Sequence, residues 1–293
     1  MRFTLLSLSL LFTTFANAQT CSWLTGSPMA YAANPSMPMV AVGSAPGYLV
    51  ASRQLSGIFA YGADIYGAAV LEQLDPLSGA VLWSCPLGDS VNVESVAVGA
   101  DGVAYYAGRF MGSLALCDGS TLSVGQGAPL YTVHQFMIAV DLNTGLLKWS
   151  RDLSHEHPEG LSVPSIAIDP QGRMWYAMAG WGSGELVRVD ELGADVELRT
   201  IEGIRSFGTI SFDPWGGLYV SGSVDDNGFT FADVSYADYG GTGYNMFLVR
   251  YRPDGSAGFA SFAADITFQD PTVVATTDGH AYLAGNLFEA TSW

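Results

Sequence analysis

SVAVGADGVAYYAG, residues 95–108, is the stretch that decides the fold. It holds a short apolar strand, a glycine-containing turn and a second strand rich in aromatic residues, which is the pattern of a β-hairpin. A sequence motif that recurs along the chain indicates a repeat architecture, before any residue is considered for chemistry. The other copies of this first hairpin are PMVAVGSAPGYLVAS at 38–52, SIAIDPQGRMWYAMAG at 165–180, TISFDPWGGLYVSGS at 209–223 and TVVATTDGHAYLAG at 272–285.

A second hairpin lies between the copies of the first. Each copy is an alternating strand, a turn that contains aspartate and closes on glycine, and another strand; period-two alternation indicates β-structure. Four residues after the turn glycine stands Trp83, Trp149 or Phe259, whereas the third copy has Glu197 there. The copies are AVLEQLDPLSGAVLWSCPL at 69–87, FMIAVDLNTGLLKWSRDL at 136–153, ELVRVDELGADVELRTI at 185–201 and MFLVRYRPDGSAGFASF at 246–262.

Two hairpins per repeat make a unit of four strands. A single four-stranded sheet cannot bury both of its faces, but radial stacking buries each sheet between its neighbours. Repeated units of this kind are typical of a β-propeller. We therefore predict an all-β chain, a β-propeller of four-stranded blades with about five blades represented. The aromatic residue after each turn should fill the gap between adjacent blades.

The first hairpin occurs five times and the second only four, so we predict that the ring is incomplete at the C-terminus. Because an open sheet edge invites aggregation, N-terminal strands are candidates to close the ring. Trp23 precedes Val40 by the same 17 residues that separate Trp149 from Ile166, which makes 19–24 a candidate outermost strand. Even so, the closing blade lacks one strand, and we expect the chain to be a piece of a longer protein with more blades.

The chain has three cysteines, Cys21, Cys85 and Cys117. The proposed strand at 19–24 would be equivalent to the strand of Cys85 in a neighbouring blade, which favours a Cys21–Cys85 disulfide. The alternative is that all three are free or buried thiols. Three cysteines are an odd number and far too few for a disulfide-rich scaffold. Their spacing fits no structural zinc site.

Parts of the repeat resemble known propeller families. LDPLSGAVLWS and VDLNTGLLKWS resemble the repeat of the pyrroloquinoline-quinone-type propellers, with its Asp, Thr-Gly turn and Trp. The longer units from Asp101 and from Gly216 resemble the SBBP-type repeat found in exported proteins of Bacteroidota. The resemblance covers nearly all of 36–285. It implies a propeller and says little about activity, since propellers host enzymes, ligand binders and scaffolds.

The N-terminus has the features of a secretory signal peptide. Arg2 is followed by an apolar stretch and then by Ala16-Asn17-Ala18, a small-x-small cleavage site. The apolar stretch is too short to span a bilayer, which takes about 20 residues. We predict a signal peptide at 1–18 and a propeller domain at 19–293. The protein should be exported, to the cell surface or the extracellular medium, with the periplasm as an alternative.

The chain is acidic, with 28 Asp and Glu against 11 Lys and Arg and a formal charge of −17. Such a charge repels nucleic acid and anionic lipid, so we expect no nucleic-acid partner. No segment after the N-terminus is long and apolar enough to span a bilayer, so we expect no membrane span. Diffuse acidity is first of all a solubility property and does not by itself define a site. The oligomeric state cannot be predicted from the sequence.

Two segments contain residues of the types that bind metals. Asp225, Asp226 and Asn227 offer hard oxygen ligands, so calcium is a candidate cofactor, although a turn between strands explains Asp-Asn-Gly more simply. His155 and His157 could share one face of a strand and bind a metal, but they lie in a link between blades with no third ligand in sequence. No other cofactor is expected.

Recurrent aspartates are expected to be structural. Asp precedes the turn glycine in every copy of the second hairpin, and Asp side chains cap such turns by accepting bonds from the following main-chain N–H groups. Among the aromatic residues, Trp175 should be part of the core. Trp181, in the loop Gly180–Gly184, is the best candidate for contact with a partner.

No catalytic set of residues can be assembled from the motifs, so none is predicted. The interpretation we favour is an exported, non-catalytic β-propeller that binds a protein or a polysaccharide through the loops of one ring face. A propeller-based hydrolase or lyase is the first alternative. A scaffold for cell-envelope assembly is the second.

Overall fold

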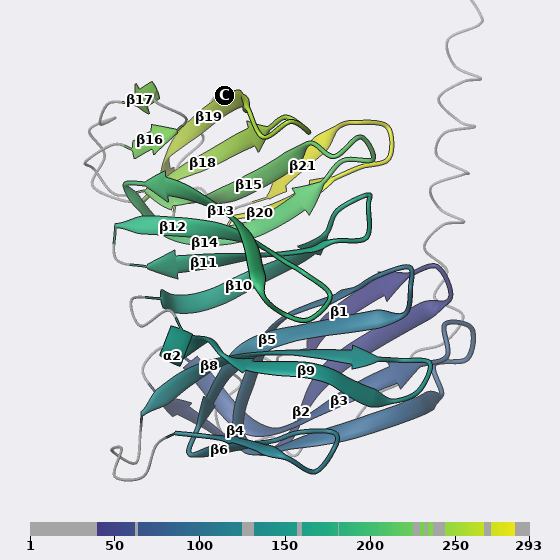
Figure 1. The fold of residues 1–293 in the computed structure, drawn as a ribbon. Helices are drawn as coiled ribbons and strands as arrows, with labels where there is room; N and C mark the ends of the chain where they lie inside the picture. Colours follow the sequence, from purple (N-terminus) through teal and green to yellow (C-terminus); the bar gives the residue numbers. More distant parts are fainter. Residues whose placement is uncertain are drawn as a thin grey trace, which may run out of the picture.

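The computed structural model describes residues 40–61, 64–124, 132–156, 160–180, 182–224, 229–231, 234–236, 244–266 and 271–284. Cys21, the segment 19–24 and the signal sequence at 1–18 lie outside the described residues. The fold is all-β: antiparallel sheets stack along the molecule from β1–β9 at one side to β20–β21 at the other (Figure 1).

The strands group into four complete blades and one hairpin, as the repeat predicts. Blade 1 contains β1 (Val40–Ala45), β2 (Tyr48–Tyr61), β3 (Asp64–Leu74) and the first part of β4 (Val81–Val98). Blade 2 contains the rest of β4, β5 (Val103–Met111), β8 (Val133–Asp141) and β9 (Leu146–Asp152). Blade 3 contains β10 (Gly160–Ile168), β11 (Met174–Gly180), β12 (Ser183–Val189) and β13 (Asp195–Glu202). Blade 4 contains β14 (Ile204–Phe212), β15 (Leu218–Val224), β18 (Tyr244–Tyr251) and β19 (Ala257–Ile266), and blade 5 is represented by β20 (Thr272–Ala275) and β21 (Ala281–Ala284).

Each first hairpin supplies the two inner strands of a blade, and each second hairpin supplies the two outer ones. Strand β4 belongs to two blades, since its N-terminal part pairs with β3 and its C-terminal part pairs with β5. The innermost strands β1, β4, β10, β14 and β20 contact one another in that order. Among the described strands, the extended contacts of β20 are with β14, β15 and β21 and not with β1, so these strands form an open arc.

Three apolar clusters lie between successive blades. Leu71 and Phe136 belong to the cluster between blades 1 and 2, and Met137 and Tyr176 to the one between blades 2 and 3. Ile201 and Phe247 belong to the cluster between blades 3 and 4. Blades 2 and 3 are thus buried on both faces by their neighbours, which is the physical reason for expecting a propeller.

The two tryptophans of the second hairpin lie between blades, as predicted, whereas Phe259 is 44% exposed. A Cβ built on the turn glycine Gly145 of blade 2 would lie 2.8 Å from Nε1 of Trp83 in blade 1. Trp149 of blade 2 covers Gly193 of blade 3 in the same way, with Cδ2 at 2.8 Å. Close packing against a glycine at positive φ explains why the turn has no side chain there.

The third copy differs, since Glu197 occupies the aromatic position. The role of the missing aromatic residue is taken by Arg199, two residues further along the same strand. The Arg199 guanidinium lies 3.3 Å from the Cβ position of Gly255. The guanidinium stacks between Trp175 and Tyr251, with its carbon 4.8 and 5.1 Å from the ring centroids. A cation–π contact replaces the indole, a substitution that the spacing alone does not predict.

Two long connections return to cover an outer strand of the preceding blade. The β5–β8 connection of blade 2 contains β6 (Ser113–Ala115) and β7 (Thr121–Ser123), and β6 contacts β4. The β15–β18 connection of blade 4 contains β16 (Phe229–Phe231) and β17 (Val234–Tyr236), and β16 pairs with β13 of blade 3. We call these the blade-2 insert and the blade-4 insert.

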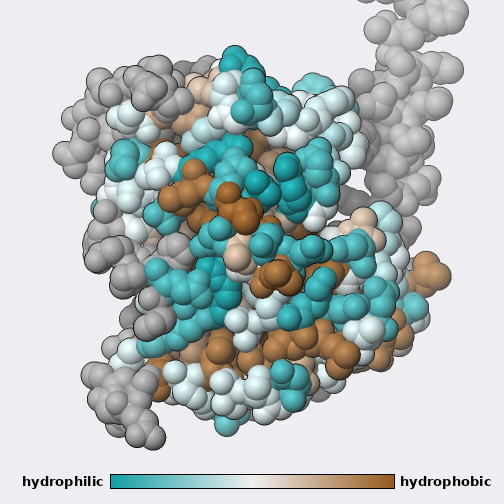
Figure 2. All heavy atoms as spheres, viewed as in Figure 1, coloured by the Kyte–Doolittle hydropathy of each residue, from teal (hydrophilic) through white to brown (hydrophobic). Residues whose placement is uncertain are grey.

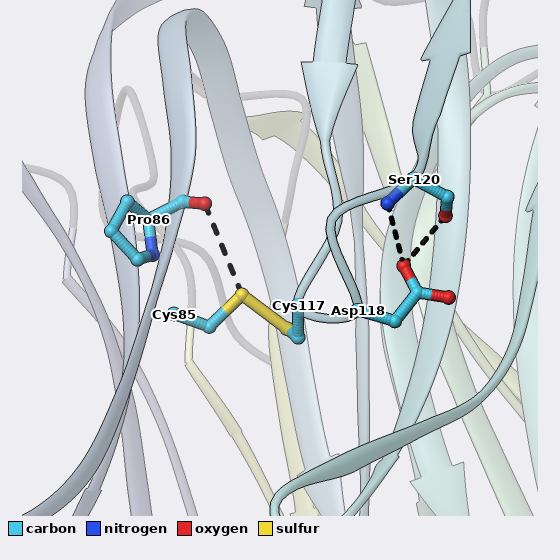
Figure 3. Close-up of a disulfide and its surroundings, with 5 residues drawn as sticks. All are labelled: Cys85, Pro86, Cys117, Asp118 and Ser120. Atoms are coloured by element: carbon cyan, nitrogen blue, oxygen red, sulfur yellow. Dashed lines mark hydrogen bonds between the residues drawn. A yellow bond between two sulfur atoms is a disulfide. The ribbon is translucent and has the colours of Figure 1, made fainter.

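A disulfide joins Cys85 and Cys117 and attaches the blade-2 insert to β4 (Figure 3). The prediction of a Cys21–Cys85 disulfide is therefore wrong, because Cys85 is already paired. The Cys21–Cys85 prediction relied on the equivalence between the segment 19–24 and the strand of Cys85 in a neighbouring blade. In the structure the blade-2 insert brings Cys117 to within 5.4 Å, Cα to Cα, of Cys85. A tight turn in which Asp118 accepts hydrogen bonds from Ser120 follows Cys117.

Candidate functional site

The two ends of the arc are built differently. At one end, which we call the turn end, the strands of each hairpin are joined by tight glycine turns. At the other, the loop end, lie the two inserts and the links between blades, including the short helix α2 (Leu153–Glu156). Figure 1 shows α2, β16 and β17 together at the left, opposite the hairpin turns.

Aspartates at the turn end have the structural role that their repetition predicts. Asp75 Oδ1 accepts hydrogen bonds from the main-chain N–H groups of Leu77 and Ser78, at 3.0 and 2.6 Å. The Ser78 hydroxyl and those N–H groups hold the pKa of Asp75 below its ordinary value. Carboxylates used in this way cap their own turns and are not available for catalysis. The equivalent residues Asp141, Asp190 and Asp254 accept from main-chain N–H groups two residues ahead.

Among the exposed aromatic residues near the turn end is Trp215, for which the sequence predicted no separate role. Trp215 is 62% exposed and packs on the turn glycine of the next blade, with Cζ3 2.7 Å from the Cβ position of Gly279. Trp175, by contrast, is 2% exposed and belongs to the core, as predicted. Trp175 Nε1 donates to Asp169 at 3.1 Å, so its polar group is satisfied inside the protein.

At the loop end, polar side chains line the face of blade 2 that packs toward blade 3. Asn92 on β4 lies opposite Arg109 on β5, and Arg109 lies opposite Gln135 on β8. Arg109 forms an ion pair with Glu94. Asn92 is 2% exposed and its Oδ1 has no hydrogen-bond partner. A buried amide oxygen without a protein partner is a place for a water molecule or a ligand hydroxyl.

A histidine and a carboxylate lie close together on the opposite face of the same blade end. His134 Nδ1 is 2.7 Å from Asp152 Oδ2, and both side chains are about one-fifth exposed. Asp152 caps α2, since its Oδ1 accepts from Ser154 N at 3.1 Å. The ring of Phe110 lies 5.8 Å from the imidazole, centroid to centroid. The helix cap and the aromatic ring together fix the orientation of the imidazole, which is what acid–base chemistry requires.

Neither site was foreseen from the sequence. His134 and Asp152 are 18 residues apart on adjacent strands, and only the β8–β9 register brings them together. Asn92 and Arg109 meet through the β4–β5 register. One sequence feature could have indicated both sites. At these positions a polar residue interrupts the alternation, where the other copies of the repeat have an apolar or small residue.

Every predicted site residue lies in a connection of the loop end. Asp225, Asp226 and Asn227 fall between β15 and β16, His157 between α2 and β10, and Trp181 between β11 and β12; these five are outside the described residues. His155 belongs to α2, but its side chain is not described. The calcium site, the histidine site and the partner contact of Trp181 all stay predictions.

The described part of the chain has a mixed surface, with separate apolar patches among polar residues on the face that Figure 2 shows. No group of three or more His, Cys, Asp or Glu side chains is placed there to hold a metal ion. Within the same residues, no helix has the length and apolar character needed to cross a membrane.

Ion pairs between blades account for other charged residues. Arg151 on β9 forms ion pairs with Asp195 on β13 and with Glu156. Burial opposes the charged form of Arg151, but these carboxylates outweigh it and raise its pKa. Burial, the charge of Asp195 and hydrogen bonding to it raise the pKa of Tyr176, so that phenol remains neutral. We regard these groups as blade contacts and not as a site.

Comparison with known proteins finds only distant structural likenesses. No protein-family model matches the chain, and no curated protein matches it. Among solved structures it is similar to the exotype rhamnogalacturonan lyase YesX, with 12% identity over 74% of this chain and a TM-score of 0.42. It is also similar to the quinohemoprotein alcohol dehydrogenase of Comamonas testosteroni, with 11% identity over 79% of this chain and a TM-score of 0.42.

The chain spans 39% of the lyase and 48% of the dehydrogenase. A member of the DUF4221 family from Bacteroides vulgatus is matched over 84% of this chain and 86% of its own, with 10% identity and a TM-score of 0.40. At such low identities and TM-scores these likenesses carry no argument, and the fold is assigned from the stacked four-stranded blades of the structure itself. The chain is a β-propeller, and its function has to be argued from its own residues.

Proposed function

We propose that the chain is an exported, non-catalytic β-propeller of the SBBP-like and quinone-propeller-like kind that binds a protein or a polysaccharide at its loop end. One observation carries the proposal: the turn end repeats one tight turn design, whereas the loop end carries two different inserts. Long connections on a rigid scaffold are where binding residues concentrate. The disulfide between Cys85 and Cys117 supports it further, because it attaches the blade-2 insert to the scaffold.

The loop end offers suitable chemistry for a polyhydroxylated ligand. Asn92 and the Glu94 side chain are buried and the Arg109 side chain is one-fifth exposed; their amide, carboxylate and guanidinium groups lie within one row of paired strands. Planar polar groups of this kind form paired hydrogen bonds with hydroxyls or with polar side chains of a protein. The predicted partner contact Trp181 and the calcium candidates Asp225, Asp226 and Asn227 lie outside the described residues, between β11 and β12 and between β15 and β16 in the sequence.

The experiment is a binding titration of the purified mature protein against a panel of neutral and acidic polysaccharides. Arg109→Ala should weaken binding at least tenfold, whereas Leu192→Ser, which changes a residue 80% exposed at the turn end, should leave it unchanged. Adding and chelating calcium in parallel tests the metal candidate. Binding that is equally affected by both substitutions would contradict a loop-end site. If no polysaccharide binds, a protein partner is the remaining form of the proposal.

A hydrolase or lyase is the second candidate, and the His134–Asp152 pair favours it. A carboxylate beside an imidazole that is about one-fifth exposed is the arrangement of a general base. The same polysaccharide panel should then release new reducing ends or unsaturated products. His134→Gln would abolish product release and leave binding intact if the pair is catalytic. No product with the unaltered protein on substrates that it binds would argue for a binding module.

Export is tested separately. The predicted signal peptide at 1–18 should be removed, so the protein recovered outside the cytoplasm of a bacterial host should begin at Gln19. Intact-mass measurement of the secreted protein decides this. Retention of residues 1–18 in a cytoplasmic product would contradict export.

A further inference from the structure

The turn of each first hairpin has an exposed residue at its tip, directly before a glycine at positive φ. In four copies this tip residue has no aromatic ring: it is Pro46, Asp101, Gln171 or Asp278. Blade 4 has Trp215 at the same position, and 62% of it is exposed. Because the turn forms with four other residues, the reason for an indole in blade 4 lies outside the turn itself.

The indole of Trp215 is held in place although it is exposed. The Trp215 main-chain N–H donates to Asp213 Oδ1 at 3.0 Å, and the turn is closed by a bond from Gly216 N to Asp213 O at 3.0 Å. The six-membered ring of the indole rests on Gly279 of blade 5, with Cζ3 2.7 Å from the Cβ position. A side chain that is fixed before binding loses little conformational entropy when a ligand covers it.

Two other blade junctions form without a contact of this kind. Within the described residues, a Cβ on Gly172 of blade 3 would meet nothing within 4 Å. A Cβ on Gly216 of blade 4 would meet only Pro253, which belongs to the same blade. The stacking of one blade on the next therefore does not require an aromatic residue at the tip of the inner turn.

Two side chains that form hydrogen bonds flank Gly279 in the sequence. The side chains of Asp278 and His280 are 65% and 72% exposed, and His280 Nδ1 lies 3.1 Å from Asp278 Oδ2. Hydrogen bonds from Thr276 and His280 lower the pKa of Asp278 to about 2. The carboxylate is therefore ionised at ordinary pH, where it accepts hydrogen bonds from hydroxyl groups and repels other carboxylates.

We propose that Trp215, Asp278 and His280 form a second binding site, at the turn end, for a neutral sugar residue of a polysaccharide. The apolar C–H face of the sugar ring stacks on the indole, and the hydroxyls at its edge bond to Asp278 and His280. An exposed indole suits such a ligand, because it offers a broad apolar surface beside polar groups. The negative charge selects against uronic acids. This site is separate from the loop end and does not depend on the function proposed for that end.

The test is a titration of the purified mature protein, followed by NMR, with oligosaccharides of mixed-linkage β-glucan, galactomannan and xylan. Oligogalacturonate is the charged control. The indole N–H signal of Trp215, assigned by its loss in Trp215→Gln, should shift with a neutral oligosaccharide and stay unchanged with oligogalacturonate. Trp215→Gln places the blade-3 tip residue in blade 4, and should raise at least tenfold the concentration that shifts the Gly279 amide. Trp215→Phe keeps an aromatic ring and should raise it less than threefold.

Two control variants separate this site from the rest of the surface. Leu192→Ser changes another exposed apolar residue of the turn end, and Arg109→Ala changes the loop end; neither should alter the Gly279 titration. The proposal is overturned if no neutral oligosaccharide shifts the signals of Trp215 and Gly279, even where one binds at the loop end. It is also overturned if Trp215→Gln lowers only the urea midpoint, because the indole would then merely join blades 4 and 5.

Discussion

Gly145 shows how a single turn residue supports the contact between two blades. Its φ of 71° and the indole of Trp83 both exclude a side chain. Gly145→Ala should destabilise the protein by about 2–4 kcal/mol, because it adds overpacking to the backbone strain. The free energy of urea unfolding measures this.

Gly172 provides the matched control. Its φ is 79°, and a Cβ there would meet nothing within 4 Å. Gly172→Ala should therefore cost only the backbone strain of about 1–2 kcal/mol. Equal losses in the two variants would mean that Trp83 does not press on the turn.

Asp213 governs a pH dependence at the residue scale. It is 1% exposed, and burial opposes its ionisation, but hydrogen bonds from Arg250 and from the N–H groups of Gly217 and Trp215 outweigh this and hold its pKa below the ordinary 3.8. A lowered pKa in the folded state stabilises the protein above about pH 4, and this stabilisation is lost as the pH falls through the folded-state pKa.

Asp213→Asn should accordingly cost about 1.5–3 kcal/mol at pH 7, since it removes a charged acceptor of several hydrogen bonds. It should also flatten the decline of stability below pH 4. Unfolding curves between pH 7 and pH 2.5 test both statements. An unchanged acid slope in the variant would assign the decline to other carboxylates.

At the scale of elements, the disulfide decides whether the blade-2 insert stays on β4. It closes a loop across 32 residues, and restricting the unfolded chain to that extent is worth about 2–4 kcal/mol. Reduction should lower the thermal midpoint of the protein. A variant with both Cys85→Ala and Cys117→Ala should start at the lower midpoint and be insensitive to reductant.

The elements also show what sequence reasoning could and could not reach. The hairpins were predictable because period-two alternation and glycine turns are local, and the structure confirms both hairpin types blade by blade. In blade 3, Arg199 takes the role that Trp149 has in blade 2. This was not predictable, because a guanidinium between Trp175 and Tyr251 depends on contacts between blades. The pairing of Cys85 with Cys117 likewise depends on the path of an insert. The His134–Asp152 site depends on strand register, which the local pattern does not specify.

At the scale of the whole molecule, the charge of −17 should make stability depend on salt. Repulsion among exposed carboxylates disfavours the compact state, and it is screened over about 10 Å at 0.1 M salt. The thermal midpoint should therefore rise by a few degrees between 20 mM and 500 mM sodium chloride. A midpoint that falls would show that ion pairs such as Arg151–Asp195 outweigh the net repulsion.

The two inserts have a consequence for how such a protein can be rearranged. Each insert leaves one blade and covers the outer strand of the blade before it, so blades 1 and 2 form one interlocked pair and blades 3 and 4 another. Duplication or recombination that cuts within a pair would strip an outer strand of its cover, whereas a cut between pairs would not. The module that evolution or an engineer can add, delete or circularly permute is therefore two blades long.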